Sequence, residues 1–437
     1  MSVASKKIES AQTSPSWVTK AIEVAQTRSS QSSMSAVVAE ALAVWNKVLF
    51  PTPRQESWKY TDTDVIAKGE FSLPATVASA VTRKDLEPFV LPDLNAYLMV
   101  FVNGVFNDAL SSKDEVAGVT VGRLAAGSDA PFGSLGQHKE ECFAALATAL
   151  TTDAVSLVVK KGAVVSRPFH VLHVVTKDAA STVLTPRLYV KAHEQSQLTV
   201  IESHVALDSV KYLALPVVEI HADDAAVVDY YKFQDESRDA FHVASMTVDQ
   251  GRSGSVSTHV FSFGGALVRN NINNLLKGSG AFSVLNGLSV LNGSQHVDNS
   301  TLIHHIEPSI ESREHFKGIY ADDSRGVFSG TITVEQIAQK TNAFQSNQAL
   351  LLSPSASIET RPQLKIWADD VKCTHGATVG QLDEDAMFYL RSRGVGREEA
   401  RNFLIHAFAS EVLTTCKVVP LREYVEGAIT AKLGVPA

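Results

Sequence analysis

Residues 156–371 form a long series of short runs rich in Val, Ile, Thr, Tyr and Phe, separated by brief polar or glycine turns. The runs at 198–201 and 227–231 are typical of β-strands. A long helical period is missing from this region. So many short strands fit a solenoid of stacked β coils better than a sandwich, since each coil buries its inward side chains against the next. We therefore predict a mainly β fold with a solenoid core, and a β-sandwich stays open as the alternative.

The N-terminal flank has a helical pattern. Val38, Leu42, Trp45 and Leu49 recur at steps of four, three and four, which gives one apolar helix face. A second helix is expected over residues 140–150. The first part of the chain is therefore predicted to be a mixed, partly helical domain.

The C-terminal flank predicts three helices. Acidic residues 383–385 favour the first turn of a helix that Gly394 would end. A second helix would begin near Arg397, and a third after Pro420 would end near Gly434. The apolar face of the second helix would comprise Ala400, Phe403, Leu404, Ala407, Phe408 and Val412.

These patterns divide the chain into three parts: an N-terminal domain over 1–152, a solenoid core over 153–377 and a helical domain over 378–437. A helical segment behind a solenoid can dock another protein or shield the last coil. The two roles are compatible.

Composition excludes several classes of protein. The 437 residues carry a net charge of −8, which argues against a nucleic-acid binder with its basic face. No stretch is apolar over the roughly 18–20 residues that a membrane span needs, and residues 1–35 contain no apolar signal-peptide core. The three cysteines, Cys142, Cys373 and Cys416, are sparse and odd in number, as in a reducing compartment. We expect a cytoplasmic protein without a membrane segment.

Cys373 and His375 are the most informative pair for chemistry. Residues i and i+2 of a strand share a face, so this thiol and imidazole could reach one point in space. Sulfur and nitrogen suit iron–sulfur clusters, zinc or copper. Spacing alone favours a packed Cys373 beside a surface His375, because C-x-H is short and common. If the pair binds metal, other ligands must come from elsewhere.

Other motifs are absent or ambiguous. The chain has no P-loop, no G-x-S-x-G elbow and no zinc-finger cysteine spacing. A further group of His and Glu residues could be a metal or acid–base cluster, but polar ladders and turns on a solenoid surface would give the same composition and are favoured. That group comprises His304, His305, Glu307, Glu311, Glu314 and His315.

Several separate blocks, in order, resemble the SufB/SufD family of iron–sulfur cluster assembly proteins. The N-terminal block at 53–61 resembles its P-R-x-E-x-W-R-Y-T segment, and the last begins with Cys-x-His-Gly-Ala-Thr and ends with Phe-Tyr-Leu-x-Ser-Arg-Gly. The remaining blocks lie at 267–272, 295–301, 316–319, 338–341 and 347–353.

The resemblance implies a right-handed parallel β-helix with helical ends. It implies a SufBCD-type complex in which a SufB-like paralogue pairs with the β-helix and SufC-type ABC ATPases dock on the C-terminal helices. A nascent iron–sulfur cluster, or iron for it, would be transient and shared with the paralogue, through His375 and, as a second candidate, Cys373. No tightly bound cofactor is expected in the isolated chain, which could form a homodimer. Expected ATPase-docking residues are Phe388, Tyr389, Leu390, Arg391, Arg393, Gly394, Phe403 and Phe408.

Two departures favour the SufD branch of the family. Where SufB carries a cysteine, this chain has Ser346, Asn347 and Gln348, and the segment that matches the E-H-E of SufB is Thr374-His375-Gly376. We therefore expect a non-catalytic scaffold subunit that helps to acquire iron and to build clusters. Two alternatives stay open: a β-solenoid enzyme acting on polysaccharide, and a self-associating structural β-helix.

Overall fold

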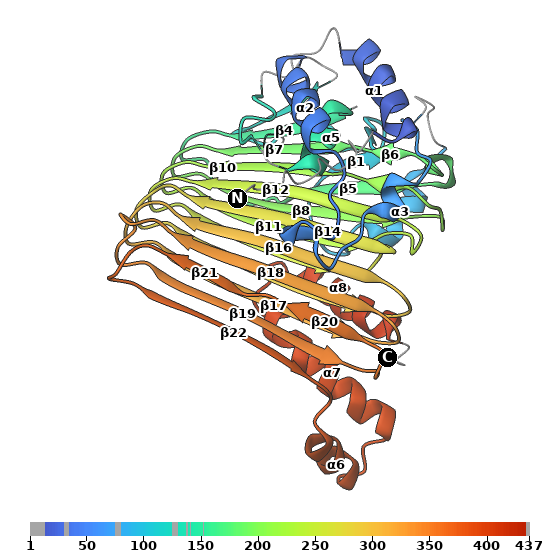
Figure 1. Ribbon diagram of the computed structural model, residues 1–437, viewed down its shortest axis with the longest axis vertical. Helices are drawn as coiled ribbons and strands as arrows, with labels where there is room; N and C mark the ends of the chain where they lie inside the picture. Colours follow the sequence, from blue (N-terminus) through green and yellow to red (C-terminus); the bar gives the residue numbers. More distant parts are fainter. Residues whose placement is uncertain are drawn as a thin grey trace, which may run out of the picture.

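Two β-sheets that face each other form the body of the protein, and helices flank it (Figure 1). The computed structural model describes residues 14–29, 35–74, 80–124, 130–136, 139, 141–151 and 153–433. Consecutive long strands alternate between the two sheets, and their ladders are parallel except for the β1–β2 and β3–β4 pairs. The predicted parallel β-solenoid is confirmed, and the sandwich alternative is wrong.

The first sheet contains, in spatial order, β2 (Val105–Phe106), β1 (Tyr97–Val102), β5 (Phe169–Val175), β8 (Gln197–Ala206), β11 (Val227–Asp235), β13 (Ser255–Ser262), β15 (Phe282–Leu291), β17 (Glu311–Tyr320), β19 (Asn342–Leu351) and β22 (Lys372–Gly380). The second sheet contains β20 (Ser357–Thr360), β18 (Arg325–Val334), β16 (His296–His305), β14 (Leu267–Leu276), β12 (Phe241–Gln250), β10 (Val217–Ala222), β7 (Pro186–Ala192), β4 (Asp153–Val159) and β3 (Val119–Arg123), with β21 (Gln363–Ile366) beside β18 and the short pair β6 (Val183–Leu184) and β9 (Leu213–Ala214).

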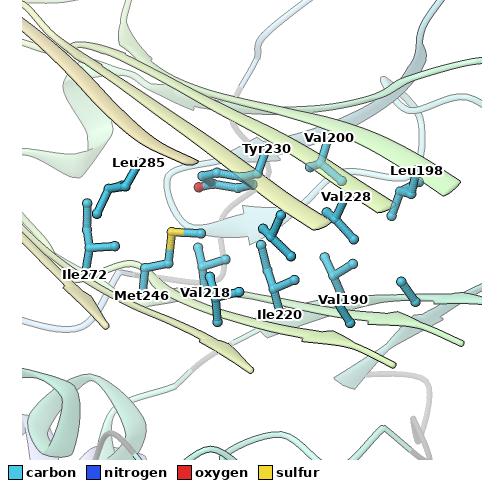
Figure 2. Close-up of a cluster of buried hydrophobic side chains, with 14 of the residues drawn as sticks. Val190, Leu198, Val200, Val218, Ile220, Val228, Tyr230, Met246, Ile272 and Leu285 are labelled. Atoms are coloured by element: carbon cyan, nitrogen blue, oxygen red, sulfur yellow. The ribbon is translucent and has the colours of Figure 1, made fainter. Parts of the chain in front are cut away.

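The solenoid core lies between the sheets because alternate side chains of every strand point inward. Figure 2 shows Val228 and Tyr230 of the first sheet facing Val218 and Ile220 of the second. The strand register places apolar side chains of successive coils beside one another. Val228, for example, lies between Leu198 and Val256 of the neighbouring coils. Each coil therefore covers the apolar side chains of the coil before it, as the sequence pattern predicted.

The N-terminal helices cover the outer face of the second sheet. They are α1 (Ser16–Ser29), α2 (Ser35–Val48) and α5 (Cys142–Ala149). Trp45, Phe50 and Phe143 form an aromatic cluster that packs with Phe241 and Leu267 of the sheet. The helix expected through residues 38–49 is confirmed by α2. The helix expected at 140–150 corresponds to α5, although residue 140 lies outside the described residues.

Short helices connect these elements: η1 (Glu56–Trp58), α3 (Asp64–Ala67), α4 (Arg83–Leu86), η2 (Glu87–Phe89) and η5 (Lys177–Ala179). The segment after η1 is fixed to the second sheet by buried polar contacts. The guanidinium of Arg269 lies 3.8 Å above the ring of Trp58 and forms an ion pair with Asp298, which also accepts a hydrogen bond of 2.5 Å from Thr61. These contacts connect the sequence blocks at 53–61, 267–272 and 295–301. The three blocks therefore have a structural role in holding this segment against the second sheet.

The C-terminal helices α7 (Arg397–Leu413) and α8 (Val419–Lys432) cover the outer face of the first sheet, and α6 (Glu384–Ser392) projects beyond the last coil (Figure 1). Gly394 has a φ of 91°, which suits the glycine expected to end α6. The apolar face predicted for the second helix is wrong at Phe403 and Ala407, which are exposed. The buried face of α7 comprises Ala400, Ile405, Ala409, Val412 and Leu413. Gly434, the expected end of α8, lies outside the described residues.

Candidate functional site at the last coil

Strand β22 forms the last coil of the solenoid and carries the Cys-x-His pair. It pairs with β19 on one side, and no other described strand pairs with its second edge. The opposing sheet ends in β20 and β21, two strands of four residues each. The end of the solenoid after β22 is therefore open among the described residues.

Cys373 and His375 share one face of β22, as their spacing predicted. In register, Cys373 lies beside Ala343 and His375 beside Gln345 of β19. Ala343 belongs to the solenoid core and Cys373 packs against that core, so this face of β22 continues the interior of the solenoid. His375 is exposed because no further coil covers it.

Burial gives the thiol and the imidazole different surroundings. Cys373 is half-buried, and this burial raises the pKa of its thiol, although a backbone hydrogen bond from Ala343 opposes the change. The thiol form is therefore favoured until a metal ion displaces the proton. Two ligand atoms leave an iron or zinc coordination sphere incomplete. The arrangement can supply part of a metal site but needs donors from another molecule.

The open end also exposes apolar side chains. Trp367 is 59% exposed, and Ile366 and Val379 are also exposed. Large exposed apolar side chains beside an unpaired strand edge are typical of an interaction surface. We define Trp367, Ile366 and Val379, with the free edge of β22, as the open-end surface.

The expected docking residues divide into two groups. Phe388 and Tyr389 of α6 and Phe403 of α7 are 73%, 58% and 53% exposed, and the guanidinium of Arg393 lies 5.2 Å from the centre of the Tyr389 ring. Arg391 and Gly394 are also exposed, while Leu390 is half-buried. We define Phe388, Tyr389 and Phe403 as the aromatic surface.

Phe408 lies apart from the aromatic surface. Its ring covers Lys317 at 4.2 Å, and the Lys317 ammonium donates to the Phe408 carbonyl oxygen at 2.9 Å and pairs with Glu411 at 2.6 Å. Lys317 is buried on the outer face of β17. Phe408 therefore helps to fasten α7 to the first sheet.

The His and Glu residues around 304–315 do not form one cluster. His304 contacts Glu335 at 2.7 Å at the coil edge, whereas His305 is buried and contacts Ser312 at 2.9 Å. Glu314 faces the interior and accepts hydrogen bonds of 2.6 Å from Thr301 and Gln345. Neighbouring residues of a strand point to opposite faces. The favoured interpretation as surface polar ladders and turns is therefore wrong for His305 and Glu314, which are buried.

Sequence reasoning missed a second group of buried His and Glu residues inside the solenoid. His173 contacts Glu202 at 2.9 Å, and His204 lies beside them. Nearby, His242 lies 2.6 Å from Glu236. Burial and the neighbouring His173 lower the pKa of His204 to about 3, so its imidazole is neutral near pH 7. The signal was present in β8, where Glu202 and His204 continue the inward alternation of Leu198 and Val200.

Comparisons with known proteins agree with the fold. Residues 19–171 match the family described as "SufBD protein N-terminal region", and residues 173–408 match "SUF system FeS cluster assembly, SufBD core domain". The chain is 32% identical to an iron–sulfur cluster assembly SufBD family protein of Synechocystis sp., over 85% of both chains. It is 30% identical to the iron–sulfur cluster assembly protein SufD of Escherichia coli, over 88% of this chain and 89% of that protein.

The parallel solenoid and these matches define the class of protein: this chain belongs to the SufB/SufD family of iron–sulfur cluster assembly proteins. Within that family it is similar to SufD, both of E. coli and, at 26% identity over 68% of this chain and 67% of that protein, of Bacillus subtilis. Family membership supports a role in iron–sulfur cluster assembly and favours it over the polysaccharide-enzyme alternative.

Helices in the described part of the chain are all too short or too polar to cross a membrane. The cytoplasmic location stays a prediction.

Proposed function

We propose that this chain is a non-catalytic scaffold subunit that helps to acquire iron and contributes to a nascent-cluster site shared with a SufB-like paralogue. The observation that carries this proposal is the placement of Cys373 and His375 on one face of a strand whose second edge has no partner among the described strands. The cluster is the cargo of this site. It is assembled there and then passed on.

The chemistry of the two ligands supports a shared site. Thiolate sulfur is the usual ligand of iron–sulfur clusters, and imidazole can replace it on iron. One Cys373 and one His375 cannot enclose a cluster, so the paralogue supplies the remaining donors. A half-exposed site also lets the finished cluster leave, which a closed structural site would prevent.

The open-end surface supports pairing with the paralogue through the β-helix. A free strand edge presents unpaired N–H and C=O groups that a strand of another chain can bind. Trp367 is the largest exposed side chain there and provides an anchor of the kind that dominates binding energies. The same surface would allow a homodimer when the paralogue is absent.

The shared site is tested by cluster reconstitution in a complex with the SufB-like paralogue and its ATPase. His375→Ala should leave complex formation intact and lower the yield of cluster, measured as iron and acid-labile sulfide per complex. Thr374→Ala is the matched control, because Thr374 is also exposed on β22 but points to the opposite face. Equal yields from the two variants would remove the reason for assigning the site to this face.

We propose further that the aromatic surface on α6 and α7 binds a SufC-type ATPase. Phe388 and Phe403 are exposed although they belong to helices that bury other apolar residues, which is typical of an interaction site. The chain itself contains no P-loop, so nucleotide hydrolysis would come from this partner.

A truncation after Gly394 would be a poor test, because it removes α7 and α8 and exposes the sheet residues beneath them. The double variant Phe388→Ala/Phe403→Ala should instead weaken ATPase binding at least tenfold, measured by calorimetry, with thermal stability unchanged. Phe282→Ala, which changes an exposed phenylalanine of β15, is the control and should bind normally. Unchanged affinity in the double variant would show that the ATPase docks elsewhere.

A further inference from the structure

We propose that His204, Glu236 and His242 form a binding site for a divalent first-row metal ion inside the solenoid, separate from Cys373 and His375. One potential ligand atom from each of the three residues lies within 4.8 Å of the other two, and all three side chains are buried. Glu236 follows β11 and His242 lies near the start of β12, so the turn between these strands brings them together. Strand β8 supplies His204.

Ring orientation selects this triad over its neighbour. The rings of His204 and His242 meet at 82° with their centres 5.0 Å apart, so in-plane lone pairs from the two rings can converge on one ion. The alternative group of His173, Glu202 and His204 has equally close atoms. There the two imidazoles are stacked at 7° with centres 4.3 Å apart, and their lone pairs lie in parallel planes that share no point. Only in the triad of His204, Glu236 and His242 can both imidazoles be directed at one ion without side-chain rearrangement.

The triad contains polar atoms that the protein leaves unsatisfied. Nδ1 of His242 lies 2.6 Å from a carboxylate oxygen of Glu236, and this buried atom has no other partner among the described residues. Nε2 of His204 is also buried; its polar neighbour is a carboxylate oxygen of Glu202 at 3.2 Å. Unsatisfied buried polar atoms are rare in proteins and need a cause. A metal ion at the point where these groups converge would satisfy them.

Surrounding residues hold the three donors in place. Glu236 accepts hydrogen bonds of 3.0 Å from Tyr212 and from Gln234, one at each carboxylate oxygen. The ammonium of Lys232 lies 2.7 Å from Nε2 of His242, which leaves Nδ1 to face the site. Outer partners that orient the ligands are a regular feature of metal sites.

The donor set indicates the kind of ion. Two imidazoles and one carboxylate with an open position suit Zn²⁺ or Fe²⁺ and do not suit Ca²⁺ or Mg²⁺, which prefer oxygen. A small cavity of about 10 Å³ lies on the Glu202 side of His204 and is lined in part by Glu202, His204 and Lys232, with room for about one water beside the triad. Arg238 and Asp239 in the turn after Glu236 are exposed, so the chain between Glu236 and His242 reaches the surface.

The test is a Co²⁺ titration of the full chain in a Cys373→Ala/His375→Ala background, which removes the proposed cluster ligands. We expect one equivalent of Co²⁺ with the visible bands of a low-coordinate nitrogen–oxygen site, and a higher melting temperature when metal is bound. Glu236→Gln, which keeps the side-chain shape, and His242→Gln should each weaken binding at least a hundredfold. Competition with Zn²⁺ and, without oxygen, Fe²⁺ then ranks the two ions.

The matched control is His170→Gln, since His170 is equally buried in the first sheet but bonds Ser203 outside the triad. It should bind Co²⁺ as the background does. Binding that survives both Glu236→Gln and His242→Gln, or a background protein that binds no Co²⁺, would overturn the proposal. If His242→Gln fails to fold, Glu236→Gln decides alone. Because the background lacks Cys373 and His375, failure here leaves the proposed cluster site untouched.

Discussion

The two ends of the solenoid differ in how they are finished. At the first end, the antiparallel pairs β1–β2 and β3–β4 interrupt the parallel ladder, and α1, α2 and α5 pack on the second sheet nearby. At the last end, β22 has an unpaired edge among the described strands, and its inward face carries an exposed His375. The same alternation that buries Val228 in β11 leaves His375 in solvent. One end is flanked by antiparallel strands and helices of the chain itself, and the other presents a strand edge that is unpaired among the described residues, which the proposed paralogue would cover.

This difference separates residues that hold the fold from residues that are available for binding. Polar side chains in the covered body of the solenoid, such as Arg269 and Asp298, are buried and paired. Side chains at the open end, such as Trp367, contribute little to the core. Substitutions in the first group should therefore change stability, and those in the second should change association.

The largest effect is expected in the covered body of the solenoid. Asp298→Ala would leave the guanidinium of Arg269 buried without its carboxylate, which costs about 3–5 kcal/mol of unfolding free energy. The corresponding change at the open end, Asp370→Ala, removes an exposed ion pair with Lys340 and should cost under about 1 kcal/mol. Denaturant unfolding of both variants measures the difference. Similar costs at the two sites would break the distinction between the covered body of the solenoid and its open end.

The pKa of Glu314 indicates how far the water-free interior of the solenoid extends toward the open end. Burial raises its pKa from 4.5 to about 7, against hydrogen bonds from Gln345 and Thr301. The folded state then holds a proton that the unfolded state releases, so stability is highest below pH 4.5 and falls by about 3 kcal/mol as the pH rises through 7. Glu314→Gln should remove this fall and so be more stable than the parent protein at pH 8.

Unfolding curves at pH 5 and pH 8 measure this effect. Gln345 contacts Glu314 and lies beside His375 in register, so only β19 separates the strand of Glu314 from β22, the last strand. If the parent protein and Glu314→Gln had the same pH dependence of stability, water would reach Glu314. The water-free interior would then end before β17.

A smaller effect is expected for a substitution on the open-end surface, and it should change only the affinity for the paralogue. Trp367→Ala should weaken binding to the SufB-like paralogue by about 2 kcal/mol, the size of an interface hot spot, and leave unfolding within about 0.5 kcal/mol of the parent. Val164→Ala changes a side chain of similar exposure near the first coils and should alter neither quantity. Affinity measured by calorimetry distinguishes them. Weaker binding in both variants would show that the effect is not specific to the open-end surface.

Much of the fold could be predicted because strand periodicity is local. The runs at 198–201 and 227–231 lie within β8 and β11, and the glycine expected after α6 is Gly394. The alternation of β22 also predicted that Cys373 and His375 would share a face. Each of these inferences depends on residues close together in the sequence.

The errors concern information that is not local. Periodicity identified apolar residues on α7, but it could not show that the helix would dock through Ile405 and Ala409 and expose Phe403. Likewise, Glu236 and His242 look like surface residues until the turn after β11 brings them together. Such residues stand out only when neighbouring coils are stacked.

Hydrogen exchange along β22 gives the most direct test of whether a neighbour completes the open end. In the isolated monomeric fraction, amides on the free edge of β22 should exchange rapidly, while those of β11, paired on both sides, stay protected. On addition of the SufB-like paralogue, we expect the β22 amides to become protected and those of β11 to stay unchanged. A complex in which β22 exchanges as fast as in the free chain would contradict the proposed pairing.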